Sequence, residues 1–299
     1  MEELEIDYTK SEDDLDNALI KEEKLDVNQD GFNTEETIIK EFFIKETGIT
    51  LKEMAVLFGQ SEEEISKEFG AYKAQKLFQK MDYVIDDASL SNEDFKNKLI
   101  SASKFGFKSV SVLPSYVGLA KSALKGKKII VRALISYPFG EDLSKVKYCA
   151  VKCSSKMGAD AFLVCVSSNN VKRGNYKLIA KEFKKIVKLA SKKNVTVMFD
   201  DKKLTPLEIE KCSRYIIKDA KVYSIMPSSV FESKVIDTGL VKDIADSLDG
   251  KCYVDGAGNV SKAIETIGLL SAGANVVSSK NCEQIAVEIN SRINSQILD

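Results

Sequence analysis

Histidine and tryptophan are absent from the 299-residue sequence, and proline occurs only four times. Without an imidazole, the chain cannot form a Ser-His or Cys-His nucleophile pair, and most zinc sites are excluded. No apolar run reaches the ~18–20 residues that span a bilayer. The acidic N-terminus lacks the basic and apolar regions of a signal peptide. The six cysteines are scattered, which is typical of a reduced compartment. We therefore expect a cytoplasmic protein with no membrane partner.

Two of the cysteines, Cys149 and Cys153, are one helical turn apart. No histidine or further cysteine accompanies them as a metal ligand. Free cysteine usually behaves as a small hydrophobic residue. We therefore interpret the pair as half-buried positions on a helix.

The overall net charge of -1 conceals a strong asymmetry along the chain. Residues 1–80 contain 21 acidic and 10 basic side chains, whereas residues 81–299 contain 24 acidic and 34 basic ones. Two modules of opposite sign can attract each other, within a chain or between chains. Compositional drift in a lysine-rich proteome is the alternative explanation. We divide the chain into an acidic module at 1–80 and a basic domain at 81–299.

The acidic module is predicted to be all helical, because its apolar side chains recur with the spacing of one helix face. Between two of these helices, residues 26–37 match the first half of a calcium loop, with oxygen ligands at Asp26, Asn28 and Asp30. The second half departs from the pattern, since Thr37 replaces the bidentate acid. An Asp/Asn/Gly turn is therefore favoured over a calcium site. We expect no other metal and no cofactor.

Residues 51–66 resemble a helix-turn-helix unit, with a small residue, a turn glycine and an apolar residue at the positions where two helices touch. A DNA-reading unit would place basic and amide side chains at the start of its second helix. This segment places Glu62, Glu63 and Glu64 there, and three carboxylates would repel phosphates. We therefore expect protein contacts and no nucleic-acid partner.

From Met81 onward, short apolar runs alternate with amphipathic helices. Strands are expected at 83–85, 109–112, 129–135, 162–166, 195–199, 222–225, 252–254 and 275–277. Helices are expected near 92–105, 114–124, 142–157, 175–192, 206–218, 236–248, 260–272 and 282–295. Eight such pairs predict an α/β fold, a (β/α)8 TIM barrel, preceded by the small all-α module. An open doubly wound sheet is the alternative, because a sequence does not show closure.

Several motifs of this domain occur in a recognisable order. They include GFKSVSVLPSYV at 106–117, LISYPFG at 134–140, VKRGNY at 171–176 and LTPLEI at 204–209. In order and spacing, they resemble motifs of the deoxyribose-phosphate aldolase family over most of residues 83–290. The resemblance implies a class I aldolase, in which a lysine amine attacks an aldehyde and forms a Schiff base. Residues 1–80 lie outside the resemblance.

The resemblance also implies three catalytic positions, and each holds a different residue here. The Schiff-base lysine position is Ser224, the second-lysine position is Tyr253, and the strand-four aspartate position is Leu163. The reactive amine must be deprotonated near neutral pH, which requires the second lysine and the carboxylate. Lys221 and Asp160 each lie three residues before the expected catalytic position, so in a strand they would face away from the barrel interior. A one-residue shift of the alignment therefore does not restore the catalytic residues. We therefore expect no catalytic residues of the family type.

The glycine-rich turn that binds phosphate in the family corresponds to residues 255–259. Its backbone, with Gly256 and Gly258, still permits an amide cradle, but Asp255 adds a carboxylate where a phosphate would bind. The last predicted strand ends at Ser278, Ser279 and Lys280. Lys280 could offset that carboxylate for a ligand, or it could pair with Asp255 and close an empty mouth. The ligand-binding candidates are thus Asp255, Gly256, Gly258, Ser278 and Ser279.

Three functions remain open from the sequence. The favoured one is a catalytically degenerate barrel that serves as a scaffold, a self-assembling protein or a regulatory binding module. Its partner would be a second copy or another protein, through the N-terminal helices and the barrel surface. The second is an active aldolase with a relocated lysine, for which Lys202, Lys203 and Lys280 are candidates. The third is a sugar-responsive helix-turn-helix regulator. A mouth filled by Leu163, Met226 and Tyr253 would favour the scaffold.

Overall fold

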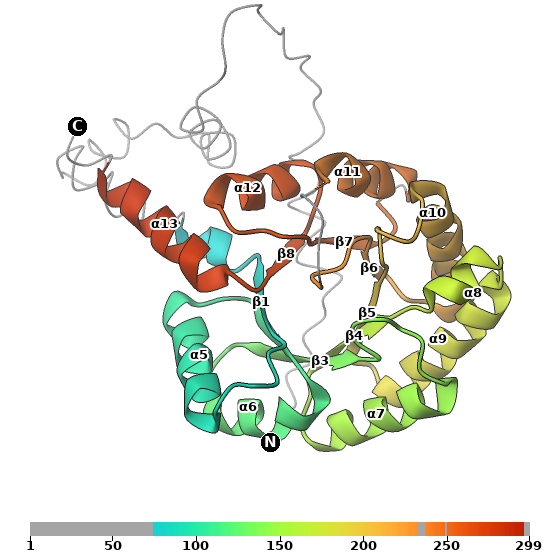
Figure 1. Cartoon of the computed structure of the whole chain (residues 1–299), viewed down its shortest axis with the longest axis horizontal. Coiled ribbons are helices and arrows are strands. Elements are labelled where there is room, and N and C mark those ends of the chain that lie inside the picture. Colours follow the sequence, from blue (N-terminus) through green and yellow to red (C-terminus); the bar gives the residue numbers. More distant parts are fainter. Residues whose placement is uncertain (1–73, 232–236, 249, 296–299) are drawn as a thin grey trace, which may run out of the picture. The chain divides into compact units, whose positions relative to one another are not determined.

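The computed structural model describes residues 74–231, 237–248 and 250–295. The predictions for residues 1–73, among them the calcium-type loop at 26–37 and the helix-turn-helix at 51–66, lie outside the described residues. In the described part, eight parallel strands form a closed barrel, and helices connect them. The predicted (β/α)8 TIM barrel is therefore confirmed. Figure 1 shows the helices as an outer ring around the strands.

The strands pair in sequence order around the barrel. They are β1 (Met81–Ile85), β2 (Ser109–Val112), β3 (Ile130–Ile135), β4 (Ala161–Cys165), β5 (Asn194–Met198), β6 (Ser224–Met226), β7 (Tyr253–Gly256) and β8 (Val276–Ser279). The ring closes where β1 pairs with β8, with Met81 opposite Val277. Closure leaves no free sheet edge, so the ladder hydrogen bonds of every strand are shared with two neighbours.

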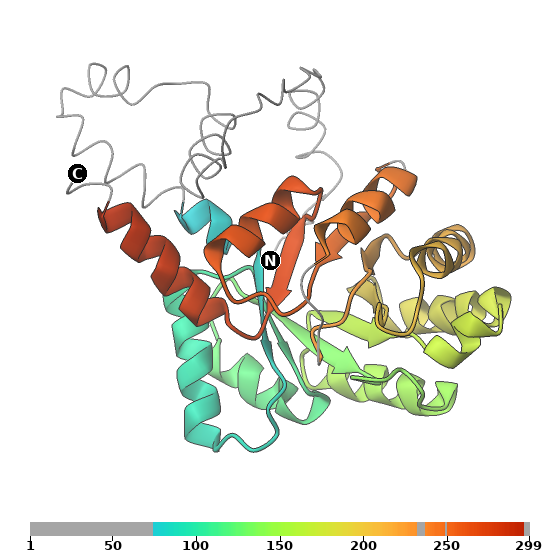
Figure 2. The same ribbon diagram turned by 45° about the horizontal axis from the view of Figure 1, so that its top comes forward.

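The helices cover the outside of this ring. They are α5 (Asn92–Phe105), α6 (Val117–Ala123), α7 (Ser144–Lys156), α8 (Ser168–Lys172), α9 (Tyr176–Ala190), α10 (Pro206–Tyr215), α11 (Thr238–Ser247), α12 (Ala263–Ser271) and α13 (Cys282–Ser295). A 3₁₀ turn at Pro114–Tyr116 precedes α6, and a π-helical turn at Ile216–Ala220 follows α10. The last helix, α13, lies beside α5 in both ribbon views (Figures 1 and 2), so the outer ring closes as the inner one does.

Local sequence explains where these helices begin and end. Ser91 accepts a hydrogen bond from the backbone N–H of Asp94 at the start of α5. The same helix ends at Gly106, whose φ of 76° is the left-handed conformation that glycine adopts without strain. A capping box of Thr205 and Glu208 begins α10. These end signals fix the helix lengths, and so they fix the direction in which each chain segment enters the next strand.

The barrel has two apolar regions. The larger one lies between the sheet and the helices, and it contains the side chains that strands such as β3 direct outward. The smaller one lies inside the barrel: Val84, Leu134, Leu163, Cys165, Met198, Met226, Val230 and Ala257. Strands of this fold are buried on both faces, which is why their sequences are nearly continuous apolar runs.

Residues 74–80, which the sequence assigned to the acidic module, pack with the barrel. Leu77 and Phe78 are 3% and 4% exposed. The Phe78 ring makes edge contacts with Phe105 and Phe107 at 5.8 and 6.0 Å between centroids. The N–H of Lys108 donates to the carbonyl oxygen of Phe78. This short segment therefore belongs to the core at the amino-terminal end of the strands.

Two further expectations concern surfaces. Within the described ranges, no helix combines the length and apolar character needed to cross a membrane. Cys149 and Cys153 are both exposed on α7, and their Sγ atoms are 3.9 Å apart. The expectation that they are half-buried is wrong, because α7 packs through the opposite face, which carries Val151 and Ser154.

Candidate functional site

The carboxyl ends of β1, β3 and β8 bring three polar side chains together at the barrel mouth. Tyr137 donates its hydroxyl proton to Oδ2 of Asp86 at 2.5 Å. The ammonium Nζ of Lys280 is 2.6 Å from the same oxygen. The side chain of Asp86 is 11% exposed and that of Lys280 is 38% exposed. A carboxylate therefore holds a phenol and an ammonium group at the place where barrel enzymes carry out their chemistry.

A tight turn after β3 presents Tyr137 to this mouth. The N–H of Gly140 donates to the carbonyl oxygen of Ser136 at 2.7 Å. Gly140 has a φ of 73°, and a Cβ at this position would collide with the carbonyl group of Val166. Only glycine fits both the conformation and the space. The motif that resembled the family's third-strand loop is thus the one that positions Tyr137.

Aromatic rings cover the same mouth. The ring of Phe231 meets Tyr137 edge-on at 6.0 Å and Phe139 at 5.5 Å between centroids. Lys280 lies 5.4 Å from the centroid of Phe231, and Lys203 lies 5.2 Å from that of Phe139. Lys203 also pairs with a carboxylate, Asp200, at 2.9 Å. Both ammonium groups are therefore stabilised by an aromatic face and a carboxylate.

Burial raises the pKa of the Tyr137 phenol well above its usual range, and the hydrogen bond to Asp86 raises it further. The phenol therefore remains protonated and acts as a donor to Asp86 at neutral pH. The third candidate lysine, Lys202, is exposed in the loop after β5, where its N–H donates to Asp200. Of the three lysines proposed from the sequence, Lys280 is the one that contacts the Asp86–Tyr137 pair within the described residues.

Below the mouth, an ionic centre occupies the barrel interior. Nη2 of Arg132 lies 2.8 Å from Oδ2 of Asp255 and 2.9 Å from the Thr196 hydroxyl, and Nη1 lies 3.3 Å from Oδ2 of Asp82. The carboxylate of Asp82 also accepts hydrogen bonds from three serine hydroxyls, at 2.5, 2.7 and 2.9 Å: Ser109, Ser111 and Ser278. Seven of the eight strands contribute to this centre when the contact of Thr196 with Ser224 is included.

Attraction between one guanidinium and two carboxylates holds this centre together. Burial alone would lower the pKa of Arg132, but the two carboxylates raise it, so the guanidinium stays charged. Burial raises the pKa of Asp255, and the guanidinium only partly opposes the shift. Two carboxylates share one buried cation, and the serine hydroxyls satisfy the remaining oxygen atoms of Asp82. The centre is therefore closed to a ligand by its own hydrogen bonds.

Several site residues predicted from the sequence lie in other places than expected. Ser224 and Tyr253 are the first residues of β6 and β7, opposite each other in the sheet and away from the mouth. Tyr253 is 43% exposed and begins β7, so it does not contribute to the filling of the mouth that would favour a scaffold. The inward positions two residues further along are Met226 and Asp255. Neither the two predicted positions nor these two inward positions hold a lysine.

Leu163 and Met226 do lie in the apolar cluster inside the barrel, and both are fully buried. Two residues before Leu163 on β4, the inward position is Ala161, so β4 adds no polar group to the ionic centre. The apolar cluster thus separates the ionic centre from the Asp86–Tyr137–Lys280 group at the mouth.

The glycine-rich turn also differs from its expected form. Asp255 lies within β7 and points inward to Arg132, and Lys280 pairs with Asp86, so the alternative of a Lys280–Asp255 pair is wrong. Ser278 donates to Asp82, and Ser279 donates to the carbonyl of Val260. A Cβ at Gly256 would lie 3.2 Å from side-chain atoms of Leu269 and Ala274, so a larger residue would have to displace them. Asp255, Gly256, Ser278 and Ser279 thus contribute contacts within the barrel.

Arg132, Phe231 and the role of Tyr137 were not predicted from the sequence. A signal for Arg132 was present, since it is the single charged residue in the apolar run 129–135, with the parity of an inward position. Phe231 gave no signal, because it follows β6 in an irregular loop.

A closed parallel barrel with polar groups gathered at the carboxyl ends of its strands belongs to the TIM-barrel class of proteins. No family model matches the sequence. Deoxyribose-phosphate aldolase of Staphylococcus carnosus is 31% identical over 204 residues, which cover 67% of this chain and 89% of the relative. The enzyme of the same name from Mycoplasmoides pirum is 28% identical over 213 residues, 70% of this chain and 96% of the relative.

Among solved structures, the deoxyribose-phosphate aldolase of Aeropyrum pernix superimposes with a TM-score of 0.66 at 18% identity, covering 77% of this chain and 98% of that one. This likeness shows the fold. Together with the relatives above, it defines the family: the chain belongs to the deoxyribose-phosphate aldolase family, as its motifs had indicated.

Proposed function

We propose that this member of the family no longer forms a Schiff base and serves as a protein-binding or scaffolding barrel. The observation that carries the proposal is the set of side chains that β4, β6 and β7 direct into the barrel: Leu163, Met226 and Asp255. None has an amine, and class I aldol chemistry requires one. Lys147 is the one buried lysine among the described residues, and its amine binds Glu182 of α9 and the carbonyl oxygen of Cys165.

Borohydride trapping tests this proposal. The full chain is incubated with acetaldehyde and borohydride, digested, and mapped by mass spectrometry beside an active aldolase of the family. We expect slow modification spread over exposed lysines, as in any lysine-rich protein. A rapid, stoichiometric adduct on one lysine, suppressed by 2-deoxyribose 5-phosphate, would contradict the proposal.

One observation favours the alternative of an active aldolase, namely the convergence of Lys280 and Tyr137 on the carboxylate of Asp86. Such a lysine could bind a carbonyl carbon while the carboxylate moved protons. Lys280→Met and Lys203→Met separate the two readings, since both lysines lie over aromatic rings at the mouth. Cleavage of 2-deoxyribose 5-phosphate that is lost only in Lys280→Met would establish the relocated lysine. We expect no cleavage in the parent chain.

A binding role also suits the surface of the molecule. The aldolase of Aeropyrum pernix is described as a tetramer, and we propose that this chain likewise associates, with itself or with another protein. The opposite charges of residues 1–80 and 81–299 support association that weakens as salt increases.

A further inference from the structure

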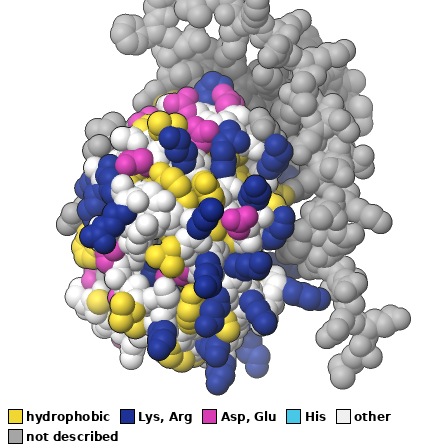
Figure 3. All heavy atoms as spheres, turned by 90° about the vertical axis from the view of Figure 1, so that its right-hand side faces the viewer, with side chains coloured by type: hydrophobic (Ala, Val, Ile, Leu, Met, Phe, Trp, Pro, Cys, Tyr) yellow, Lys and Arg dark blue, Asp and Glu magenta, His cyan; other side chains and the backbone are white. Residues whose placement is uncertain are grey.

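One face of the barrel carries a concentration of lysine side chains. Figure 3 shows the side of the molecule that lies to the right in Figure 1, around α8, α9 and α10, and dark blue side chains crowd over it. Five exposed lysines lie on α9 alone: Lys177, Lys181, Lys184, Lys185 and Lys188. Within the described part of the chain, no ion pair to a carboxylate joins any of the five. Their charge is therefore available to an anionic partner.

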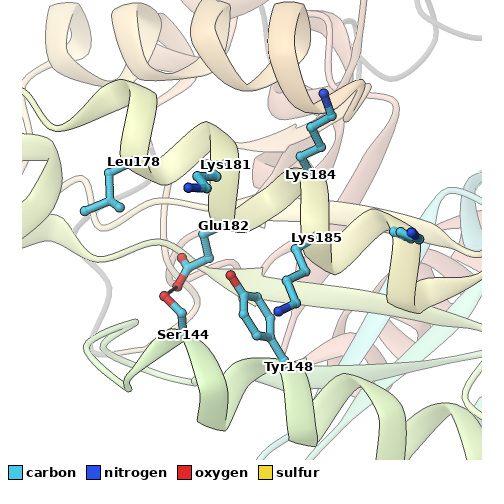
Figure 4. A pocket seen from close by; sticks show the side chains of 8 residues that line it. Ser144, Tyr148, Leu178, Lys181, Glu182, Lys184 and Lys185 are labelled. Atoms are coloured by element: carbon cyan, nitrogen blue, oxygen red, sulfur yellow. Dashed lines mark hydrogen bonds between the residues drawn. The ribbon is translucent and has the colours of Figure 1, made fainter.

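A groove of about 520 Å³ runs between α7 and α9 beneath these lysines (Figure 4). Ser144 and Tyr148 line it from α7, and Leu178 with four of the lysines lines it from α9. Lys185 points toward the ring of Tyr148, with its Nζ 4.5 Å from the centroid, whereas Lys184 points away from it. Leu178 is 56% exposed. The groove thus combines unpaired cations with apolar surface.

Glu182 is the one acidic residue among those that line the groove, and its carboxylate is already paired within the protein. Its Oε1 accepts a hydrogen bond from the Ser144 hydroxyl at 2.6 Å. Its Oε2 accepts one from the ammonium of buried Lys147 at 3.2 Å. Little negative charge therefore remains to repel an anionic partner, and this buried pair ties α7 to α9 and holds the groove in shape.

We infer that the α7–α9 groove binds an acidic polypeptide segment with interspersed aliphatic side chains, supplied by residues 1–30 of a second copy. Those residues contain twelve carboxylates, three lysines and several aliphatic residues, among them Leu15, Leu19 and Ile20. Carboxylates would pair with the lysine row, and a leucine or isoleucine would cover Leu178 and the stems of the lysines. A nucleic-acid strand offers the charge but no aliphatic side chain to cover Leu178. The inference rests on the proposed binding role and names its surface.

Fluorescence anisotropy tests the site, with a labelled synthetic peptide of residues 1–30 titrated with the full chain. The triple variant Lys181→Glu, Lys184→Glu and Lys188→Glu should weaken binding about tenfold or more, because three attractive contacts become repulsive. The matched control reverses three exposed lysines on another face, Lys96, Lys125 and Lys127. It should change binding about twofold or less, since only long-range, salt-screened attraction is lost. Equal weakening by both triple variants would overturn the inference.

The apolar component has its own matched pair, because Leu178 and Leu207 are each 56% exposed on neighbouring helices. Leu178→Ser should weaken peptide binding about threefold or more, and Leu207→Ser should leave it unchanged. Tighter binding of a twelve-nucleotide uridine RNA than of the peptide, lost in the α9 triple variant, would assign the face to nucleic acid and refute the inference.

Sedimentation of the full chain supplies the second readout: self-association should fall in the α9 triple variant and persist in the control. An adduct in the borohydride test would reject the proposed loss of catalysis without affecting these titrations, so the two failures are distinguishable.

Discussion

At the scale of single side chains, the guanidinium of Arg132 stabilises two carboxylates inside the barrel, as water would do at the surface. Asp82 and Asp255 come from β1 and β7, and the apolar cluster lies between them and the mouth. A buried ion pair of this kind is a weak source of net stability, because desolvation offsets most of its attraction. Removing one partner is nevertheless costly, since a bare charge is left in a medium of low polarity.

Replacing Arg132 by methionine should lower the free energy of unfolding by about 3–5 kcal/mol near neutral pH. Burial raises the pKa of Asp255 already, and loss of the guanidinium removes the main opposing influence. A carboxyl group whose folded-state pKa is raised contributes stability at low pH and loses it as the pH rises through that pKa. The loss of unfolding free energy in Arg132→Met, relative to the parent, should therefore be smaller at about pH 5 than at about pH 8.

Urea titrations at both pH values measure this effect. Lys121→Met is the control, because its ion pair with Asp160 is 38% exposed on both sides and should contribute less than about 1 kcal/mol. If Arg132→Met lost as little unfolding free energy as the control, water would already solvate the carboxylates of Asp82 and Asp255.

Which residues meet inside the barrel was only partly predictable. Parity along a strand placed Leu163 and Met226 inward, and it placed Asp160 outward, where it pairs with Lys121. Parity alone did not show depth, because depth depends on where each strand begins. Asp255 was therefore assigned to a phosphate-binding turn, although it lies one tier below the mouth.

At the scale of elements, the alternation of apolar and amphipathic segments predicted every strand and every long helix close to its observed bounds. The largest consequence came from β6, expected at 222–225 and found at Ser224–Met226. Lys221 ends the preceding π-helical turn in the left-handed conformation, and Tyr223 is exposed, so the strand starts later. This shift moves Ser224 from the mouth to the far end. The short helix α8 was missed, because five residues carry no periodic signal.

The capping box of α10 gives a prediction at this scale. Glu208 binds Lys172 of α8 and the N–H of Thr205, and these hydrogen bonds lower the pKa of its carboxyl group to about 2. A carboxyl group with a lowered pKa contributes stability above its ordinary pKa, and the contribution is lost as the pH falls toward the lowered value. Between about pH 4.5 and about pH 2, stability should therefore fall more steeply in the parent than in Glu208→Gln.

Thermal unfolding midpoints across this pH range provide the measurement. Glu210→Gln removes a carboxylate from the same helix without touching the cap, and its profile should follow that of the parent. Parallel profiles for Glu208→Gln and the parent would contradict the assigned role of the capping box.

At the scale of the whole molecule, the barrel depends on residues that precede its first strand. A chain that starts at residue 81 lacks Leu77 and Phe78, whereas one that starts at residue 74 keeps them. Full burial of such side chains contributes about 1.5–3 kcal/mol each. We expect the chain from residue 74 to unfold at higher urea concentration than the chain from residue 81. Identical urea midpoints would show that the segment adds nothing to the core.

The charge asymmetry was readable at this scale from composition alone, but its position on the barrel was not. The sequence distributes lysine along residues 81–299, whereas the fold brings four lysines of α9 together along the groove with α7. Helical periodicity predicts that such residues share the solvent face of a helix. It does not predict which neighbouring helix completes a groove, because that follows from the winding of the barrel.

The position of Arg132 also has a consequence for how the chain reaches its final form. Its two acidic partners come from the first and seventh strands, and Asp255 lies 123 residues further along the chain. During synthesis, the arginine is therefore made long before its second counter-charge exists. A partly assembled barrel of six strands would enclose a cation with half of its partners, which is unfavourable in a dry interior. Half-barrels are penalised in this way, which favours addition of the last strands together rather than one at a time.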